Sequence, residues 1–240
     1  MPEILASVKD GNVSISNANF STARDATSGT SFADAQATST AAIRCAKVSF
    51  RGSFNFFIVR SFFEFDTSGI STTPSAATLK LYGQSTTSAD FFVVKSTVAD
   101  GATLSFAEFD SIDGWSAGAD NSSNVTKYSS EVTSWSTGAY NNITLNSTAL
   151  SDMANNDTLK ICLIEADFDL TNTEPSDTTI RQTGLSYAND GEGNIRDPKI
   201  DYTEGTAAGY GHEVISVAAG SIGKVKSVAT ANIGKINTVD

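Results

Sequence analysis

The sequence predicts an all-β fold, an antiparallel β-sandwich followed by a short C-terminal repeat tail. Three observations predict this fold. Segments rich in aromatic and β-branched residues recur along the chain, as is typical of strands. Clusters of Gly, Asn, Asp, Ser and Thr separate them, and these residues favour turns. No long helical pattern alternates with the strands, which favours sheet packed on sheet over a βαβ architecture.

The strongest strand signal is NFFIVRSFFEF, residues 55–65, which is apolar at both parities. A strand buried on both faces has this pattern. We expect Phe57, Val59, Phe63 and Phe65 to be buried. The apolar residues expected to face them are Leu79, Leu81, Ile161 and Leu163. The other predicted strands are residues 42–50, 77–83, 91–97, 141–146, 158–168 and 198–203, and one short helix is predicted at 149–157.

The composition changes after Tyr202, where Ala and Gly replace the aromatic strand residues. This change predicts where the sandwich ends. We place the sandwich at residues 1–204, a linker at 205–213, and an assembly tail built from an eleven-residue repeat at 214–240.

The tail contains two copies of one unit, VAAGSIGKVKS and VATANIGKINT. Apolar anchors fall at the first, sixth and ninth positions of each unit, and they are Val217, Ile222, Val225, Val228, Ile233 and Ile236. On a helix these anchors share an arc of roughly 140°, but glycines weaken a helix interior. We therefore expect short helical turns alternating with extended segments centred on Val. Two units cannot bury an apolar face alone, so the anchors are expected to make assembly contacts; a disordered tail is the alternative.

The charge of the chain argues against two classes of partner. The formal net charge is -11, from 27 acidic and 16 basic residues. A protein that binds nucleic acid needs a surplus of Lys and Arg to neutralise phosphates, and so does a protein that binds an anionic membrane surface.

The sequence shows no targeting or membrane-spanning segment. The N-terminus has no basic region followed by an apolar core, and no stretch reaches the roughly 18 apolar residues of a membrane span. We expect a protein made in the cytoplasm without a signal peptide, with no nucleic-acid or membrane partner.

Catalytic patterns are scarce in this sequence. Its single histidine, His212, falls in the expected linker, where it cannot complete a Ser-His-Asp triad within the sandwich. Three acids lie close to Trp115 in the sequence, and they are Glu108, Asp110 and Asp113. We interpret them as solvated loop acids, which is a simpler explanation than the catalytic carboxylate pair of a glycosidase. We therefore predict no catalytic residue and no enzymatic activity.

Two acidic loops, residues 165–177 and 189–194, are rich in the oxygen ligands that Ca²⁺ prefers. Neither loop matches a defined calcium-binding pattern. The loops leave two interpretations open, solvated acids or a structural calcium ion, and no other cofactor is expected. The candidate ligands are Asp167, Asp169, Asp190 and Glu192.

Three aromatic residues, Trp115, Trp135 and Tyr140, occur in polar, turn-rich stretches. Rings presented from loops can stack on sugars, whereas rings packed at the rim of a core contribute apolar area. Both interpretations stay open. Cys45 and Cys162 lie in strand-like apolar segments and are expected to be buried free thiols, with a disulfide between them as the alternative.

Three ordered segments resemble one family. VRSFFEFDTSGISTTPSAATLKLYG (59–83) is similar to its R-x-hydrophobic-x-FD…TLxLY signature, and residues 140–169 resemble its later strand, helix and strand. IRDPKIDYT (195–203) resembles its closing strand. This family is the disaggregatase-related (DNRLRE-type) β-sandwich, a jelly-roll relative of carbohydrate-binding modules. The resemblance implies a jelly-roll-like sandwich. The tail resembles the repeats common at the ends of tailed-phage virion proteins.

Two functional hypotheses follow. The first is a non-enzymatic virion structural protein of a tailed bacteriophage, a capsid decoration, fibre or tail-associated component that forms homo-oligomers or binds other virion proteins through its tail. The second is a carbohydrate-binding module that attaches a larger assembly to polysaccharide. Both can hold for one protein, because a surface module of a particle can also bind host glycans.

Overall fold

The structure is a computed structural model. It describes residues 1–7, 10–34, 37–86, 89–101, 103–188, 191, 195–206, 224–225 and 228–229. The chain divides into two compact units, Met1–Glu204 and Gly205–Asp240. The boundary falls where the composition changes.

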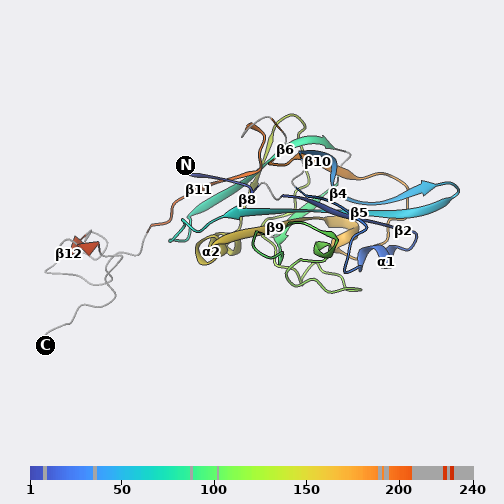
Figure 1. Ribbon diagram of the computed structural model, residues 1–240, viewed down its shortest axis with the longest axis horizontal. Helices are drawn as coiled ribbons and strands as arrows, with labels where there is room; N and C mark the ends of the chain where they lie inside the picture. The colour runs from blue at the N-terminus through green and yellow to red at the C-terminus, as the bar shows by residue number, and fades with distance from the viewer. Residues whose placement is uncertain are drawn as a thin grey trace. The chain divides into compact units, whose positions relative to one another are not determined.

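The first unit is an all-β, antiparallel structure, as the sequence predicts (Figure 1). Its strands are β1 (Glu3–Leu5), β2 (Gly11–Asn17), β3 (Ser31–Asp34), β4 (Thr38–Phe50), β5 (Ser53–Asp66), β6 (Ala76–Thr86), β7 (Phe91–Lys95), β8 (Tyr140–Thr144), β9 (Thr158–Glu165), β10 (Gln182–Ser186) and β11 (Lys199–Thr203). The helical elements are α1 (Phe20–Arg24), α2 (Ser147–Asn155), a 3₁₀ turn η1 (Phe106–Glu108) and a π turn η2 (Ala166–Leu170).

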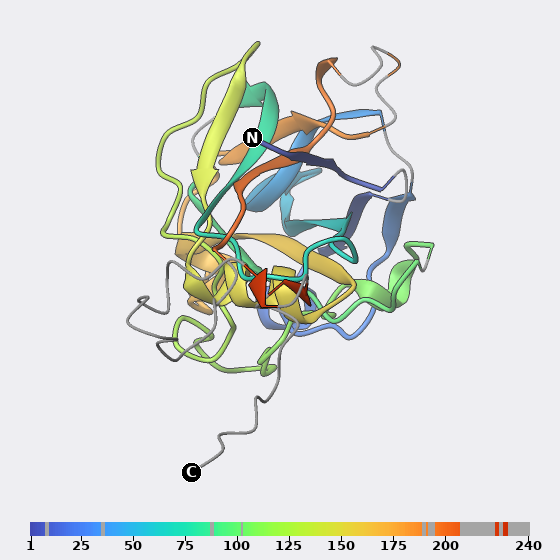
Figure 2. The same cartoon turned by 90° about the vertical axis from the view of Figure 1, so that its left-hand side faces the viewer.

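The strands form two layers, which Figure 2 shows from the end of the molecule. One layer has the order β1-β11-β6-β8, and the other has the order β3-β2-β5-β9-β7. The long strand β4 connects them, because its second half pairs with β5 and its first half pairs with β10. Strand β10 in turn pairs with the end of β6. The two layers are therefore parts of one hydrogen-bonded network.

The core between the layers contains the residues that the sequence places there. Phe63 and Phe65 of β5 and Ile161 and Leu163 of β9 form one buried cluster with residues of the facing layer. Those facing residues include Leu79, Leu81, Ile143 and Ile200. Burial of these apolar side chains is the main stabilising term of the sandwich.

A second core lies on the other face of the β5 layer. It contains Ile58 and Phe62 of β5 and Cys162 and Ile164 of β9, the alternate residues of the same strands. Helix α1 and the segment 104–125 cover this face. The prediction that residues 55–65 form a strand buried on both faces is therefore confirmed.

The expected burial of Phe57 is wrong. Phe57 is half-buried and belongs to neither core, while Val59 is buried. Phe57 lies between Ala46 of β4 and Ser16 of β2, and the guanidinium of Arg44 lies 5.1 Å from its ring centroid. Neither core extends to this ring, so Arg44 covers it only in part.

The predicted strands and the predicted helix are present, with shifted ends. Strand β9 ends at Glu165, although the sequence favours a strand to residue 168. The carboxylate of Glu165 accepts hydrogen bonds from the backbone N–H groups of Asp167, Phe168 and Asp169 and so begins the π turn. The predicted helix at 149–157 corresponds to α2, which Asn146 caps two residues earlier than expected.

In the second unit the structure describes two short strands, β12 (Lys224–Val225) and β13 (Val228–Ala229). They pair antiparallel, with Val225 opposite Val228. These two anchors are extended, as expected of Val-centred segments. The other four tail anchors and His212 lie outside the described residues. Among the described residues, none of the helices has the length and apolarity needed to cross a membrane.

Candidate functional site

A cluster of buried charges lies in the second core. The guanidinium of Arg60, from the middle of β5, is fully buried, and so is the carboxylate of Asp169 in the π turn. Arg60 donates two hydrogen bonds to this carboxylate, Nε to Oδ2 at 2.9 Å and Nη2 to Oδ1 at 2.7 Å. Paired, charge-assisted bonds of this kind are strong and fix orientation. Arg60 also donates to the carbonyl oxygens of Phe109 and Arg24.

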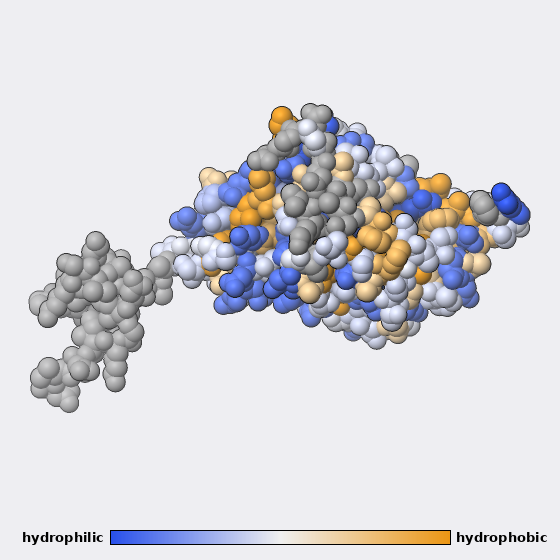
Figure 3. Space-filling model, viewed as in Figure 1, coloured by the Kyte–Doolittle hydropathy of each residue, from blue (hydrophilic) through white to orange (hydrophobic). Residues whose placement is uncertain are grey.

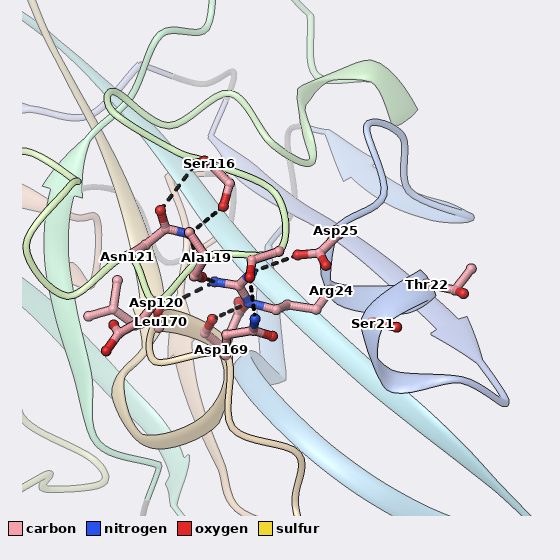
Figure 4. Close-up of polar contacts among 12 residues, drawn as sticks. Ser21, Thr22, Arg24, Asp25, Ser116, Ala119, Asp120, Asn121, Asp169 and Leu170 are labelled. Atoms are coloured by element: carbon pink, nitrogen blue, oxygen red, sulfur yellow. Dashed lines mark hydrogen bonds and ion pairs between the residues drawn. The ribbon is translucent and has the colours of Figure 1, made fainter.

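Arg24, at the end of α1, is the second buried cation. Its Nε donates to the carbonyl oxygen of Asp169 at 2.7 Å, and its Nη2 donates to that of Ala119 at 2.8 Å. Its Nη1 pairs with the carboxylate of Asp25 at 2.6 Å. Figure 4 shows these contacts converging on one guanidinium from three separate segments of the chain. Arg24 therefore joins α1, the 116–121 loop and the π turn.

Trp115, one of the predicted ligand-binding residues, packs on these cations. Its ring centroid lies 4.3 Å from the guanidinium carbon of Arg24 and 4.1 Å from that of Arg60. The ring is half-buried against the second core. Desolvated cation–π contacts of this kind contribute about 2 kcal/mol.

The buried carboxyl group of Glu165 adjoins this cluster. Burial raises its pKa to about 7, although the three backbone N–H groups that it accepts favour the ionised form. The neighbouring carboxylate of Asp169 raises the pKa further. Burial therefore outweighs the hydrogen bonds in setting the protonation of this group.

The two described calcium-ligand candidates differ in environment. Asp167 is exposed, whereas both carboxylate oxygens of Asp169 accept bonds from Arg60. The other two candidates, Asp190 and Glu192, lie outside the described residues. Within the part of the chain that the structure describes, no group of three or more His, Cys, Asp or Glu side chains could hold a metal ion.

The acids close to Trp115 take part in local hydrogen bonds. The carboxylate of Glu108 accepts from the backbone N–H of Ser105 at 2.6 Å and from its hydroxyl at 2.7 Å, which forms a capping box for the 3₁₀ turn. Asp113 accepts a hydrogen bond from the hydroxyl of Thr126 at 2.5 Å. Partial burial raises the pKa of Asp110. Two of these three acids thus have structural roles.

The other two aromatic candidates, Trp135 and Tyr140, adjoin in the sequence the two segments that line a polar groove, but neither is itself a lining residue. The indole N–H of Trp135 donates to the carbonyl oxygen of Gly184 at 3.2 Å, and its ring meets that of Phe91 edge to face. The hydroxyl of Tyr140 donates to the carbonyl oxygen of Asp197 at 3.0 Å. Both rings are half-buried.

The groove itself, which we call the β8 groove, runs between β8 and the segment 129–134. Its volume is about 460 Å³, and its lining is rich in hydroxyl and amide groups, with Glu131 as the charged member. Asn141 bonds to Ser136 at one end, and Asn146 bonds to the carbonyl oxygen of Lys127 at the other. These asparagines hold the segment at a fixed distance from the strand.

A second open cleft lies at the start of β9. Its volume is about 520 Å³, and hydroxyl, amide, ammonium and carboxylate groups line it. Its two lysines are paired, Lys95 with Asp152 and Lys160 with Asp100, each at 2.9 Å. The hydroxyl of Tyr128 donates to the same Asp152 at 2.5 Å. We refer to it as the β9 cleft.

Both cysteines are free and buried, as expected, and they belong to the second core. Burial raises the pKa of each thiol well above its usual range. Neither group therefore has the character of a reactive thiolate.

Sequence reasoning missed the two buried arginines. A signal was present for Arg60, because it is the one basic residue in the strongest apolar strand of the chain. A charge in such a strand must find a buried partner.

No family model matches this sequence, and none of the curated proteins compared with it is similar.

Proposed function

We propose that this protein is a non-enzymatic structural component of a tailed-bacteriophage particle that assembles through its C-terminal repeat. A capsid decoration, a fibre or a tail-associated protein fits this description, with a jelly-roll-like sandwich as the folded body. The proposal places the protein in the virion, as a homo-oligomer or bound to other virion proteins. The observation that carries it is the repeat, which begins only after the sandwich has ended at Glu204.

The size of the repeat supports an assembly role. The described strands Lys224–Val225 and Val228–Ala229 pair antiparallel, with Val225 opposite Val228. An isolated pair of short strands is at best marginally stable in water. Stable burial of the six anchors therefore requires another surface, and a second chain or another particle protein would supply it.

The buried charges support a structural role for the sandwich. Arg24, Arg60 and Asp169 bond to one another or to backbone carbonyls inside the second core. Groups engaged in this way join segments of the fold and are not presented to a substrate.

Removal of residues 205–240 tests the proposal. We expect the shortened protein to stay folded and to lose oligomerisation or incorporation into particles. Light scattering measures the first property, and a particle-incorporation assay measures the second. Assembly of the shortened protein to the same extent as the full chain would overturn the proposal.

Carbohydrate binding is the second candidate function, and the β8 groove favours it. Hydroxyl and amide side chains such as Asn142 and Thr144 line this groove. A concave site rich in such groups is suited to the hydroxyl groups of a sugar.

Calorimetric titration with a panel of oligosaccharides tests this second function. We expect Asn142→Ala to abolish binding, because the substitution removes a groove amide. Asn155→Ala, which removes an amide from the β9 cleft instead, is the matched control. If no oligosaccharide binds the unaltered protein, or if the control substitution alone abolishes binding, the β8 groove is not the sugar site.

A further inference from the structure

The β4–β5 hairpin differs from the rest of the molecule in charge. Residues 42–57 contain three basic residues, Arg44, Lys47 and Arg51, and no acidic one. All 27 acidic residues lie outside this segment, together with 13 of the 16 basic ones. Figure 1 shows the hairpin projecting from one end of the sandwich. The protein therefore carries a cationic projection on a strongly acidic body.

The hairpin also exposes aromatic surface. The side chain of Phe54 is 47 % exposed, and the ammonium group of Lys47 lies 5.1 Å from its ring centroid. Phe57 is half-buried beneath Arg44 on the other face of the hairpin. Figure 3 shows hydrophobic side chains at the surface toward the base of the hairpin and hydrophilic ones at its tip. Aromatic and arginine side chains are enriched at protein interfaces.

The turn holds the tip in a defined shape. Arg51 and Gly52 have φ angles of 50° and 84°, which is the two-residue turn that matches the twist of a hairpin. The carboxylate of Glu174 lies 3.8 Å from the ammonium group of Lys47. A rigid tip loses little conformational entropy when it binds.

The opposite end of β5 carries the complementary charge. This strand has 14 residues and spans about 45 Å, so Asp66 lies far from the hairpin tip. Asp66 pairs with Thr158, which lines the β9 cleft. Two acids, Asp100 and Asp157, line this cleft with its two lysines. Three more acids lie beside it: Glu64 opposite Lys160, Asp66 opposite Thr158, and Asp152 bonded to Lys95. The side chain of Asp100 is 68 % exposed.

We propose that the β4–β5 hairpin of one copy of this chain docks at the acidic β9 cleft of a second copy. The charges of the two ends are complementary, and the cleft of about 520 Å³ offers a polar recess at the receiving end. This contact goes beyond the proposed function, because it lies on the sandwich and does not involve the repeat. A head-to-tail contact uses two different surfaces, so repeated contacts form a ring or an open row of molecules.

Two full-length variants test the contact. Arg51→Glu reverses the charge at the hairpin tip, and Asp100→Lys combined with Asp157→Lys reverses it at the cleft. Arg196→Glu is the matched control, because it reverses another cation that lies over an aromatic ring, 5.3 Å from that of Tyr82, and belongs to neither the hairpin nor the lining of the cleft. Thermal unfolding checks that each variant is folded.

Light scattering over a range of concentrations then measures association at low and high salt. We expect the unaltered protein to associate most strongly at low salt. Each charge reversal at an end is expected to weaken the association about tenfold or more, because like charges then meet, while the control leaves it unchanged. Association through the repeat is common to all variants, so the comparison isolates the hairpin contact.

A mixture of the two end variants gives the sharpest result. In the mixture the intact hairpin meets the intact cleft, and the reversed hairpin meets the reversed cleft with opposite charges again, so mixing should restore the association that each variant loses alone. Equal association of all variants, or no gain on mixing, would overturn the proposed contact. Either result leaves the proposed function standing if removal of residues 205–240 still abolishes assembly.

Discussion

The ion pair between Arg60 and Asp169 predicts a large effect of one substitution. Asp169→Asn removes the charge that balances a fully buried guanidinium. Breaking a buried pair on one side costs about 3–5 kcal/mol, because the remaining charge is uncompensated. We expect the free energy of unfolding, measured in urea, to fall by this amount.

Asp167→Asn is the control for this substitution. Asp167 is exposed and lies two residues away in the same π turn. Its replacement should change the free energy of unfolding by less than about 0.5 kcal/mol. Similar losses from both substitutions would show that the turn, and not the ion pair, determines the stability.

Glu165 predicts that stability depends on pH. Its pKa is about 7 in the folded protein, above the ordinary value of 4.5, so folding favours the protonated form. Its contribution is complete below about pH 4.5 and is lost as the pH rises through 7. We expect this group to lower the free energy of unfolding by up to about 3 kcal/mol between pH 4.5 and 8.

Urea unfolding of Glu165→Gln as a function of pH tests this prediction. Glutamine is neutral at every pH and keeps a carbonyl oxygen that can accept from the π turn. The loss of stability between acidic and neutral pH should therefore disappear in this variant. A pH dependence equal to that of the unaltered protein would assign the effect to another group.

The role of Asp169 could not be predicted from the sequence, although the residue was singled out as a calcium-ligand candidate. Its partner Arg60 lies 109 positions away in the sequence. A loop whose acids bind calcium and a loop whose acid accepts hydrogen bonds from a buried arginine have the same local composition. Only the strand pairing that brings β5 beside β9 distinguishes them.

Strand β5 contributes to both cores, so a truncation within it should be costly. Phe63 is 3 % exposed and packs in the core between the layers, where its ring stacks on that of Tyr187. Phe63→Ala should lower the free energy of unfolding by about 3–5 kcal/mol, as expected for a large residue replaced by alanine in a core. Urea denaturation measures the change.

Phe54→Ala is the matched control within the same strand. Phe54 is 47 % exposed, so the same chemical change removes far less buried surface. A stability loss for Phe63→Ala no larger than that of the control would contradict the assignment of Phe63 to the core.

The elements rich in aromatic residues were predictable, and the polar ones were not. Residues 55–65 and 158–165 carry dense apolar patterns because both faces of β5 and β9 are buried. Strand β2, GNVSISN, and strand β10, QTGLS, have few apolar residues and resemble the turns around them. Their pairing with β5 and β4 defines them as strands, and that pairing depends on distant parts of the chain.

The division of the chain near Glu204 predicts that the sandwich is independently stable. Residues 1–204 form a compact unit with both cores inside it. We expect removal of residues 205–240 to leave the melting temperature of the sandwich unchanged within about 2 °C. Calorimetry measures it, and a larger decrease would mean that the tail stabilises the sandwich.

Within the whole molecule, the boundary at residue 204 was predictable, because a change of amino-acid composition marks it. The β8 groove and the β9 cleft were not. Each combines residues from segments that only the completed sandwich brings together, such as Lys95 with Asn155 and Ser129 with Asn142.

Strand β5 also has a mechanical consequence. It runs for 14 residues and is flanked by β2 and β4 in its first part and by β9 in its last. Hydrogen bonds in antiparallel sheets lie perpendicular to the strands. A force pulling along β5 would therefore load many of these bonds at once and would have to shear them together. Resistance to such a force is set by the rate of unfolding, so the pairing of β5 along its whole length predicts slow unfolding under a force along this axis.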